Sequence, residues 1–177
     1  METLIKAHNN KILSKKQQQA PTNNNQQSAD SNSRQSCNCQ RRSECPLPGK
    51  CNTKTVVYRA TVTTDRSKKT YIGSTENTFK IRFYGHKSDL SNPRYRSNTT
   101  LSNYVWSLKD RGEEPEVRWE IVKVCKPYKA GTRKCDLCLT EKYFILKEKG
   151  PDSLNKRSEL MFTCPHKKKW KLVNVKT

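Results

Sequence analysis

The chain has 177 residues, of which only 32% are hydrophobic, and a mean hydropathy of −1.03, so it can bury only a small core. Its 36 Lys and Arg residues outnumber 16 Asp and Glu residues, which gives a formal net charge of +20. This excess favours nucleic acid as the partner; the alternative is a solvated basic surface without a ligand. The sequence has no long apolar run, lipidation motif or signal peptide, so we expect no membrane partner.

Eight cysteines would suit a disulfide scaffold in a secreted protein. The basic composition and the missing signal peptide instead predict an intracellular, nuclear protein, in which thiols stay reduced. Clustered cysteines are then best interpreted as metal ligands. A secreted, disulfide-rich basic protein is the competing interpretation.

The first 52 residues divide into two parts. Residues 1–36 are rich in Gln, Asn and Ser and predict a disordered polar tail, because they bury too little apolar surface to offset their ordering entropy. Residues 37–52 predict a cysteine-rich zinc knuckle, since four thiolates in so short a loop can surround one Zn²⁺ ion. The alternative is a floppy linker whose thiols are reduced or partly disulfide-bonded. The four candidate zinc ligands are Cys37, Cys39, Cys45 and Cys51.

The remaining residues, 53–177, predict one folded domain that begins with a β-hairpin. Residues 55–64 and 70–76 are rich in β-branched and aromatic residues, and the short polar connection between them favours antiparallel pairing. Thr78 can cap a helix over residues 79–90. The apolar stripe of this helix would consist of Phe79, Ile81, Phe83 and Leu90.

Three further elements follow the hairpin and its helix. Residues 99–112 predict a helix with apolar residues at helical spacing, 116–126 predict an alternating strand, and 135–150 predict a second apolar-faced helix. The order strand, strand, helix, helix, strand, helix predicts an α+β fold, in which a small three-stranded antiparallel sheet is flanked by helices.

Four side chains of this region are candidates for a common site. Tyr58 and Tyr71 lie on the two hairpin strands, and Arg82 and His86 share one face of the next helix because they are four residues apart. Taken singly, each has an ordinary structural role in packing or solvation. If the helix lies over the hairpin, the two phenols, the guanidinium and the imidazole converge.

The same pattern resembles the GIY-YIG nuclease superfamily. The triplet at 56–58, Val-Val-Tyr, stands where the family has Gly-Ile-Tyr, and the triplet at 71–73 is Tyr-Ile-Gly. In that family an arginine on the following helix, a glutamate on a later helix and an asparagine after it complete the site, and Glu141 and Asn155 stand in matching order. The resemblance covers about residues 53–160 and implies a GIY-YIG-like fold and a metal-dependent DNA endonuclease.

The resemblance also implies how metal and phosphate would be bound. Glu141 would bind one Mg²⁺ or Mn²⁺ ion, which acts as a Lewis acid and stabilises the leaving oxygen, and no small-molecule cofactor is needed. The planar guanidinium of Arg82 would hold the scissile phosphate. Asn155 would support the glutamate or the substrate backbone.

The identity of the general base stays open between two residues. Tyr58 is the family's suggested base, but a phenol with a pKa near ~10 needs a neighbour such as His86 that favours the phenolate. Either residue can therefore take the proton. Tyr71 would orient water or phosphate.

A second group of cysteines lies towards the C-terminus. Cys135 and Cys138 form a C-x2-C pair just before the glutamate, and a zinc ion there would fix the start of the helix that bears it. The alternative is that these thiols pack as small apolar groups. We expect Cys125 and His166 as the other ligands, with Cys164 as a substitute.

Three segments resemble the endonuclease module of Penelope-like retroelements, which nicks target DNA to create a primer. These segments are PLPGKC before the first strand, CLTEKYFIL and LNKRSEL. The chain contains no polymerase, so we expect a truncated copy or a domesticated stand-alone protein. The competing function is that of an inactive, basic remnant that binds nucleic acid without cutting it.

Overall fold

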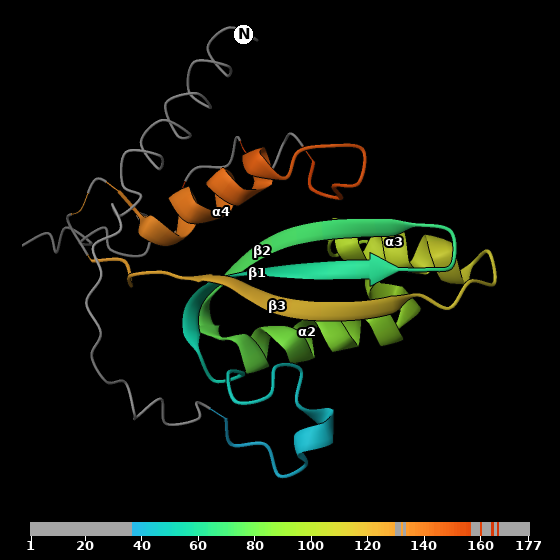
Figure 1. The fold of residues 1–177 in the computed structure, drawn as a ribbon, viewed down its shortest axis with the longest axis horizontal. Helices are drawn as coiled ribbons and strands as arrows, with labels where there is room; N and C mark the ends of the chain where they lie inside the picture. The colour runs from blue at the N-terminus through green and yellow to red at the C-terminus, as the bar shows by residue number, and fades with distance from the viewer. Residues whose placement is uncertain are drawn as a thin grey trace, which may run out of the picture.

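The computed structural model describes residues 37–129, 132, 134–156, 160, 164 and 166. The tail predicted over residues 1–36 lies outside this part of the chain. In chain order the elements are η1 (Arg42–Glu44), β1 (Lys54–Thr63), β2 (Lys68–Thr78), α2 (Phe79–Ser91), η2 (Pro93–Tyr95), α3 (Thr100–Lys109), β3 (Glu116–Val124) and α4 (Asp136–Lys147) (Figure 1).

The strands form one antiparallel sheet in the order β2-β1-β3. Tyr58 lies at the middle of the central strand, opposite Gly73 on β2 and Ile121 on β3. The predicted α+β fold with a three-stranded antiparallel sheet is therefore confirmed, and each predicted element matches its observed bounds to within three residues. The relation to GIY-YIG nucleases stays a prediction.

Helices cover both faces of the sheet, with α2 below it and α4 above it in Figure 1. Because side chains alternate along a strand, Tyr58 on β1 packs with α2 and α3, whereas Val57 and Ile72 pack with α4. The molecule thus has two small cores separated by the sheet. None of the described helices is both long enough and apolar enough to cross a bilayer.

Helix α2 begins as predicted, with the Thr78 hydroxyl accepting a hydrogen bond from the backbone N–H of Ile81. Its predicted apolar stripe is wrong at one position, because Ile81 is 60% exposed. The residues that face the sheet are Phe79, Phe83, His86 and Leu90, which follow true helical spacing. The predicted stripe therefore included an isoleucine that faces outwards and omitted a histidine that is buried in the core.

The outer edge of β2 is covered by the chain after α4. Thr70 donates its backbone N–H to Asp152 at 2.8 Å and accepts one from Leu154 at 2.7 Å, so this segment runs beside β2 like a short parallel strand. Covering the edge satisfies its backbone groups and hinders pairing with other chains. The same contact brings Asn155 to the strand that carries Tyr71.

Candidate active site and metal centres

The hydroxyl of Tyr58 is the centre of a buried hydrogen-bonded chain. Nε of Arg82 donates to it at 2.9 Å, and Nε2 of His86 lies 2.8 Å from it. A guanidinium can only donate, so the phenol oxygen accepts from Arg82, whereas the direction of its bond with His86 depends on which ring nitrogen carries the proton. The predicted convergence of these three residues is thus present in the structure.

Burial sets the protonation states of the tyrosine and the histidine in this hydrogen-bonded group. His86 is fully buried, and burial together with the nearby charge of Arg82 lowers its pKa to about 3. Burial raises the pKa of Tyr58 to about 12; Arg82 opposes this rise, and the charge of Glu141 adds to it. Both shifts oppose transfer of the phenol proton to the imidazole. The structure therefore differs from the expectation that His86 favours the phenolate.

Stability below neutral pH should depend on His86. Its pKa of about 3 in the folded state lies below its ordinary value, so between about 3 and 6.5 the unfolded chain binds more protons than the folded chain. The contribution is complete above about pH 6.5 and should fall by about 1.4 kcal/mol per pH unit on acidification through that window. Urea unfolding at pH 4–7 should show a shallower pH slope for His86→Gln than for the wild type. Equal slopes would mean that His86 is not buried in its neutral form.

Gly73 makes room for the Tyr58 ring. A Cβ atom built on this glycine would lie 2.5 Å from the phenol oxygen and 2.6 Å from the ring carbon that bears it. On its other sides the ring meets Phe79, His86 and Trp119, with ring centroids 5.3–5.9 Å away. The glycine of the second triplet therefore accommodates the tyrosine of the first, a role that the sequence analysis did not assign.

The charged side chain of Arg82 is held by the hydrogen bond that its Nε donates to Tyr58. Burial lowers its pKa, but the attraction and hydrogen bond to Tyr58, together with attraction to Tyr71 and Asp89, outweigh this effect, so the pKa is raised overall. Within the described residues, its two terminal nitrogens donate no hydrogen bond. Such a planar pair of donors matches the oxygens of a phosphate group.

Glu141 lies on the side of α4 that faces the sheet. It follows Leu137 and precedes Ile145 by four residues each, and both of these side chains are buried. Its charge is near enough to Tyr58 to raise the pKa of that phenol. Glu141 is therefore not a solvent-facing helix residue, and the carboxylate lies in the electrostatic environment of the tyrosine.

Asn155 pairs with the backbone of β2. Its side-chain oxygen accepts from the N–H of Ile72, and its amide nitrogen donates to the carbonyl of Ile72, both at 2.8 Å. These two hydrogen bonds fix the backbone of β2 at Ile72, between Tyr71 and Gly73. The predicted support of the glutamate or of the substrate backbone stays a prediction. Tyr71 lies beside His86, with ring centroids 6.2 Å apart, and is 9% exposed.

The C-terminal end of α4 is tied to the sheet by ion pairs. Arg59 on β1 donates to both carboxylate oxygens of Glu148 just beyond the helix, with its Nε bond at 2.9 Å, and also pairs with Glu120 on β3. Glu148 in turn raises the pKa of Arg59. These contacts place the end of the helix that carries Glu141.

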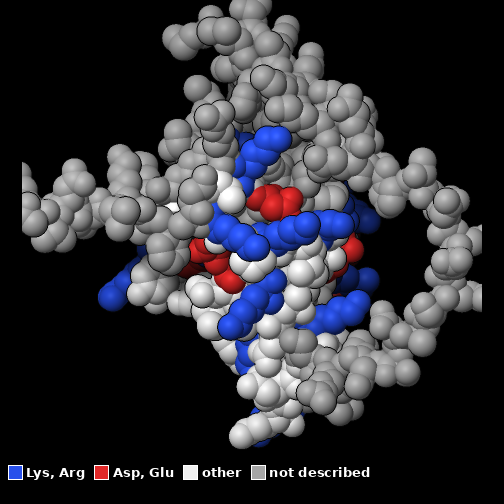
Figure 2. Space-filling view, turned by 90° about the vertical axis from the view of Figure 1, so that its left-hand side faces the viewer, with Lys and Arg blue, Asp and Glu red and all other residues white. Residues whose placement is uncertain are grey.

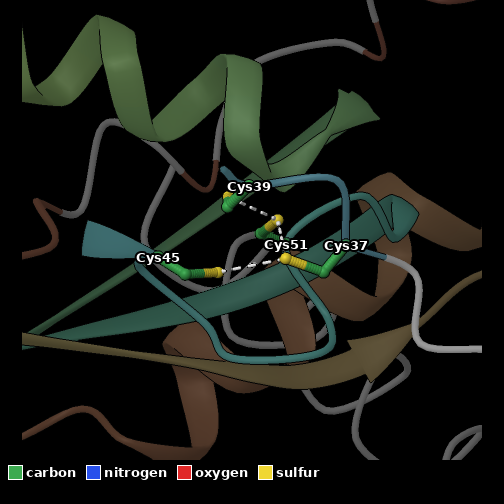
Figure 3. A group of neighbouring side chains, drawn as sticks. All are labelled: Cys37, Cys39, Cys45 and Cys51. Atoms are coloured by element: carbon green, nitrogen blue, oxygen red, sulfur yellow. Dashed lines mark hydrogen bonds between the residues drawn. The ribbon is translucent and has the colours of Figure 1, made fainter. Parts of the chain in front are cut away.

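The thiols of Cys37, Cys39, Cys45 and Cys51 point towards one another (Figure 3). The sulfur atoms of neighbouring pairs are 3.3–3.6 Å apart, and all four lie within 4.8 Å of one another. Four thiolates around a tetrahedral zinc ion with bonds of about 2.3 Å have sulfurs about 3.8 Å apart. This group could therefore hold a metal such as zinc.

A second group consists of Cys135, Cys138, Cys164 and His166, whose ligand atoms also lie within 4.8 Å of one another. It could likewise hold a metal such as zinc. The prediction that Cys125 is a ligand is wrong for this group, and Cys164 takes its place. Cys125 is held at the sheet instead, because its N–H bonds to Thr55 just after β3 ends. All eight cysteines are free thiols.

No protein-family model, curated protein or solved structure matches this chain. The resemblance to GIY-YIG nucleases therefore rests on the sequence motifs.

Two residues near these sites were missed by sequence reasoning. Glu76 on β2 bonds the histidine of the second cysteine group, and Arg59 fixes the end of α4. The signal for Glu76 is its position on β2, because it has the same strand parity as Ile72, which packs against α4. No local pattern distinguishes Arg59 from the other basic residues.

Proposed function

We propose that the protein is a metal-dependent DNA endonuclease that hydrolyses phosphodiester bonds. The observation that carries this proposal is the geometry of Arg82, whose Nε is anchored on Tyr58 while its terminal nitrogens make no hydrogen bond within the described residues. A guanidinium presented in this way, bonded to a phenol on which the charge of Glu141 also acts, suits the recognition of phosphate beside a cation.

The residues present fit one divalent ion. Mg²⁺ keeps most of its waters and takes one or two carboxylates together with phosphate oxygens. Glu141 supplies one carboxylate that faces the sheet. When bound, Mg²⁺ or Mn²⁺ would act as a Lewis acid and stabilise the charge that develops during hydrolysis.

The protein's own residues would bind the phosphate, position its binding group and orient water. Arg82 binds the phosphate and neutralises part of the negative charge of the transition state. Tyr58 and His86 are positioning residues, because both are fully buried and together hold the Arg82 side chain. Tyr71, the more exposed of the two phenols, orients water or phosphate. Asn155 keeps Tyr71 and its strand in place.

The charge of the molecule supports DNA as the substrate. The net charge is +20, and Figure 2 shows lysine and arginine side chains across the face turned to the viewer, with acidic patches between them. Neutralising phosphates releases counterions and favours binding without regard to sequence. The motifs shared with Penelope-like modules extend the proposal to nicking of target DNA in the nucleus by a protein of retroelement origin.

Nicking of supercoiled plasmid tests this function directly. We expect the wild-type protein to convert plasmid to the open-circular form with Mg²⁺ or Mn²⁺ and to stop when EDTA is added. A gel-shift assay under the same conditions measures DNA binding separately. Binding without cleavage in either metal, on single-stranded and double-stranded DNA, would replace the endonuclease with a binding remnant.

Replacing Arg82 with alanine should lower the nicking rate about 100- to 1000-fold, the typical cost of removing one group that stabilises transition-state charge. Arg118→Ala is the matched control, since that arginine is exposed and pairs with its neighbour Glu116. Both variants lose one positive charge, so gel-shift affinity should fall similarly. Similar nicking rates for both variants would remove Arg82 from the site.

We also propose that the first cysteine group holds a structural zinc ion. Its loop is joined to the start of α2, because Lys80 donates its N–H to the carbonyl of Cys51 at 2.7 Å. Nζ of Lys80 also reaches the side chain of Asn38 at 3.0 Å. Zinc would thus brace the loop against the helix that carries Arg82 and His86.

A further inference from the structure

In the second cysteine group, the histidine contacts both the thiols and an acidic residue of β2. Nδ1 of His166 lies 3.2–3.4 Å from the sulfurs of Cys135, Cys138 and Cys164. Its other nitrogen, Nε2, lies 2.8 Å from a carboxylate oxygen of Glu76 on β2. The two nitrogens of one ring thus face three thiols on one side and an acid on the other.

This arrangement fixes the proton on the imidazole. A carboxylate accepts, so Nε2 carries the proton and donates a hydrogen bond to Glu76, which leaves the lone pair of Nδ1 directed at the thiols. Metal-binding histidines usually donate their second N–H to a carboxylate or a carbonyl in this way. His166 is 7% exposed, and the site is therefore largely shielded from water.

We propose that Cys135, Cys138, Cys164 and Nδ1 of His166 bind one Zn²⁺ ion, with Glu76 as the hydrogen-bond acceptor that orients the histidine. Three cysteines and one histidine are an established structural zinc set, and zinc bonds of about 2.3 Å to sulfur and 2.0 Å to nitrogen place S and N about 3.5 Å apart. The observed separations of 3.2–3.4 Å need only a small outward shift on binding.

The ion would link three separate parts of the chain. Cys135 and Cys138 belong to the start of α4, His166 and Cys164 to the segment near the C-terminus, and Glu76 to β2. Helix α4 is already tied to the sheet at its other end by Arg59 and Glu148. Zinc would therefore fix the start of the helix as the ion pair fixes its end.

This double attachment bears on the proposed active site, and this part of the inference rests on the proposed function. Glu141 lies three residues after Cys138, and Tyr71 lies five residues before Glu76. The zinc ion would thus set the position of the carboxylate on α4 relative to the strand that carries the phenol. Loss of zinc should make the position of Glu141 relative to Tyr71 more variable, and it should leave the basic surface unchanged.

Metal analysis of the purified full-length protein tests the ligand set. Cys138→Ala should contain one Zn²⁺ ion fewer per chain than the wild type, whereas the matched variant Cys125→Ala should contain the same number. With Co²⁺ in place of Zn²⁺, the visible absorption of thiolate-bound cobalt should fall in Cys138→Ala only. Equal metal content in Cys138→Ala and wild type, or loss in Cys125→Ala instead, would overturn the assignment.

Glu76→Gln tests the site without removing a ligand, so folding is preserved. We expect Zn²⁺ affinity of this site, measured by competition with a chelator, to fall about 10- to 100-fold, the usual effect of losing such a hydrogen-bond partner. Glu114→Gln, which changes an exposed glutamate, should bind Zn²⁺ like the wild type. Unchanged affinity in Glu76→Gln would remove Glu76 from the proposal.

Nicking assays separate the site from the proposed function. Cys138→Ala should nick more slowly and still bind DNA, whereas Cys164→His, which gives a Cys2His2 set, should keep both zinc and nicking. Bound zinc in a wild-type protein that never cuts DNA would refute the endonuclease and leave the metal site standing. Full nicking by Cys138→Ala after zinc loss would refute the coupling to Glu141.

Discussion

Glu141→Ala should abolish metal-dependent nicking, with a fall in rate of at least about 1000-fold. A catalytic metal ion contributes several kcal/mol to stabilisation of the transition state, and each 1.4 kcal/mol corresponds to a factor of ten. Glu141 faces the sheet between two buried residues of α4, and its charge acts on Tyr58. Its loss should therefore remove the carboxylate that the proposed ion needs.

DNA binding by Glu141→Ala should be retained, because the substitution removes a negative charge from a basic protein. Glu114→Ala changes an exposed glutamate and serves as the control with the same charge change. Plasmid nicking and gel-shift assays at equal Mg²⁺ concentration measure both properties. A nicking rate for Glu141→Ala within threefold of Glu114→Ala would exclude Glu141 as the metal ligand.

Gly73→Ala should destabilise the fold by about 1–3 kcal/mol, the usual cost of inserting a methyl group into a packed core. The new Cβ would stand 2.5 Å from the Tyr58 hydroxyl, whose ring is enclosed by three other rings. Tyr58 must then move, and the hydrogen bond that holds Arg82 is lost. Urea unfolding measures the stability, and the plasmid assay should show slower nicking.

Gly85→Ala is the matched control for Gly73→Ala. Gly85 lies within α2, and a Cβ there would meet no atom within 4 Å. The same substitution should therefore stabilise the protein, by about 0.5–1 kcal/mol, because alanine favours a helix more than glycine does. Equal stability of the two variants would mean that the structure accommodates a methyl group beside Tyr58 without loss of stability. Gly73 would then not be required to make room for the Tyr58 ring.

Local rules predicted the secondary structure well, because each element had its own signal. The β-branched alternation of residues 55–64 and the threonine before α2 are properties of short segments, and both match the observed strand and cap. They failed at Ile81, which is exposed because it lies about 200° around the helix from Phe79, whereas His86 follows the buried spacing. A hydrophobicity pattern cannot predict that a polar ring is buried when its hydrogen-bond partner is 28 residues away.

The second cysteine group shows the same limit. The C-x2-C pair is a local signal and identified Cys135 and Cys138 correctly as members of the group. The choice between Cys125 and Cys164 depends on how the chain returns after α4, and the sequence contains no spacing rule for that path. Glu76 lies 90 residues before His166, so only the packed sheet and helix bring the two together.

By itself, the sequence determined the composition of the sheet, the start of each helix, the large positive charge and the short list of reactive side chains, since these follow from neighbouring residues. The tertiary structure decided which of those side chains meet. In the folded protein, Arg82 and His86 both bond the hydroxyl of Tyr58. The Tyr58 ring packs against Gly73, and the Asn155 side chain bonds the backbone of Ile72. Such contacts depend on the register of β1 with β2 and on the helices packed over both faces, which form only when the whole chain has folded.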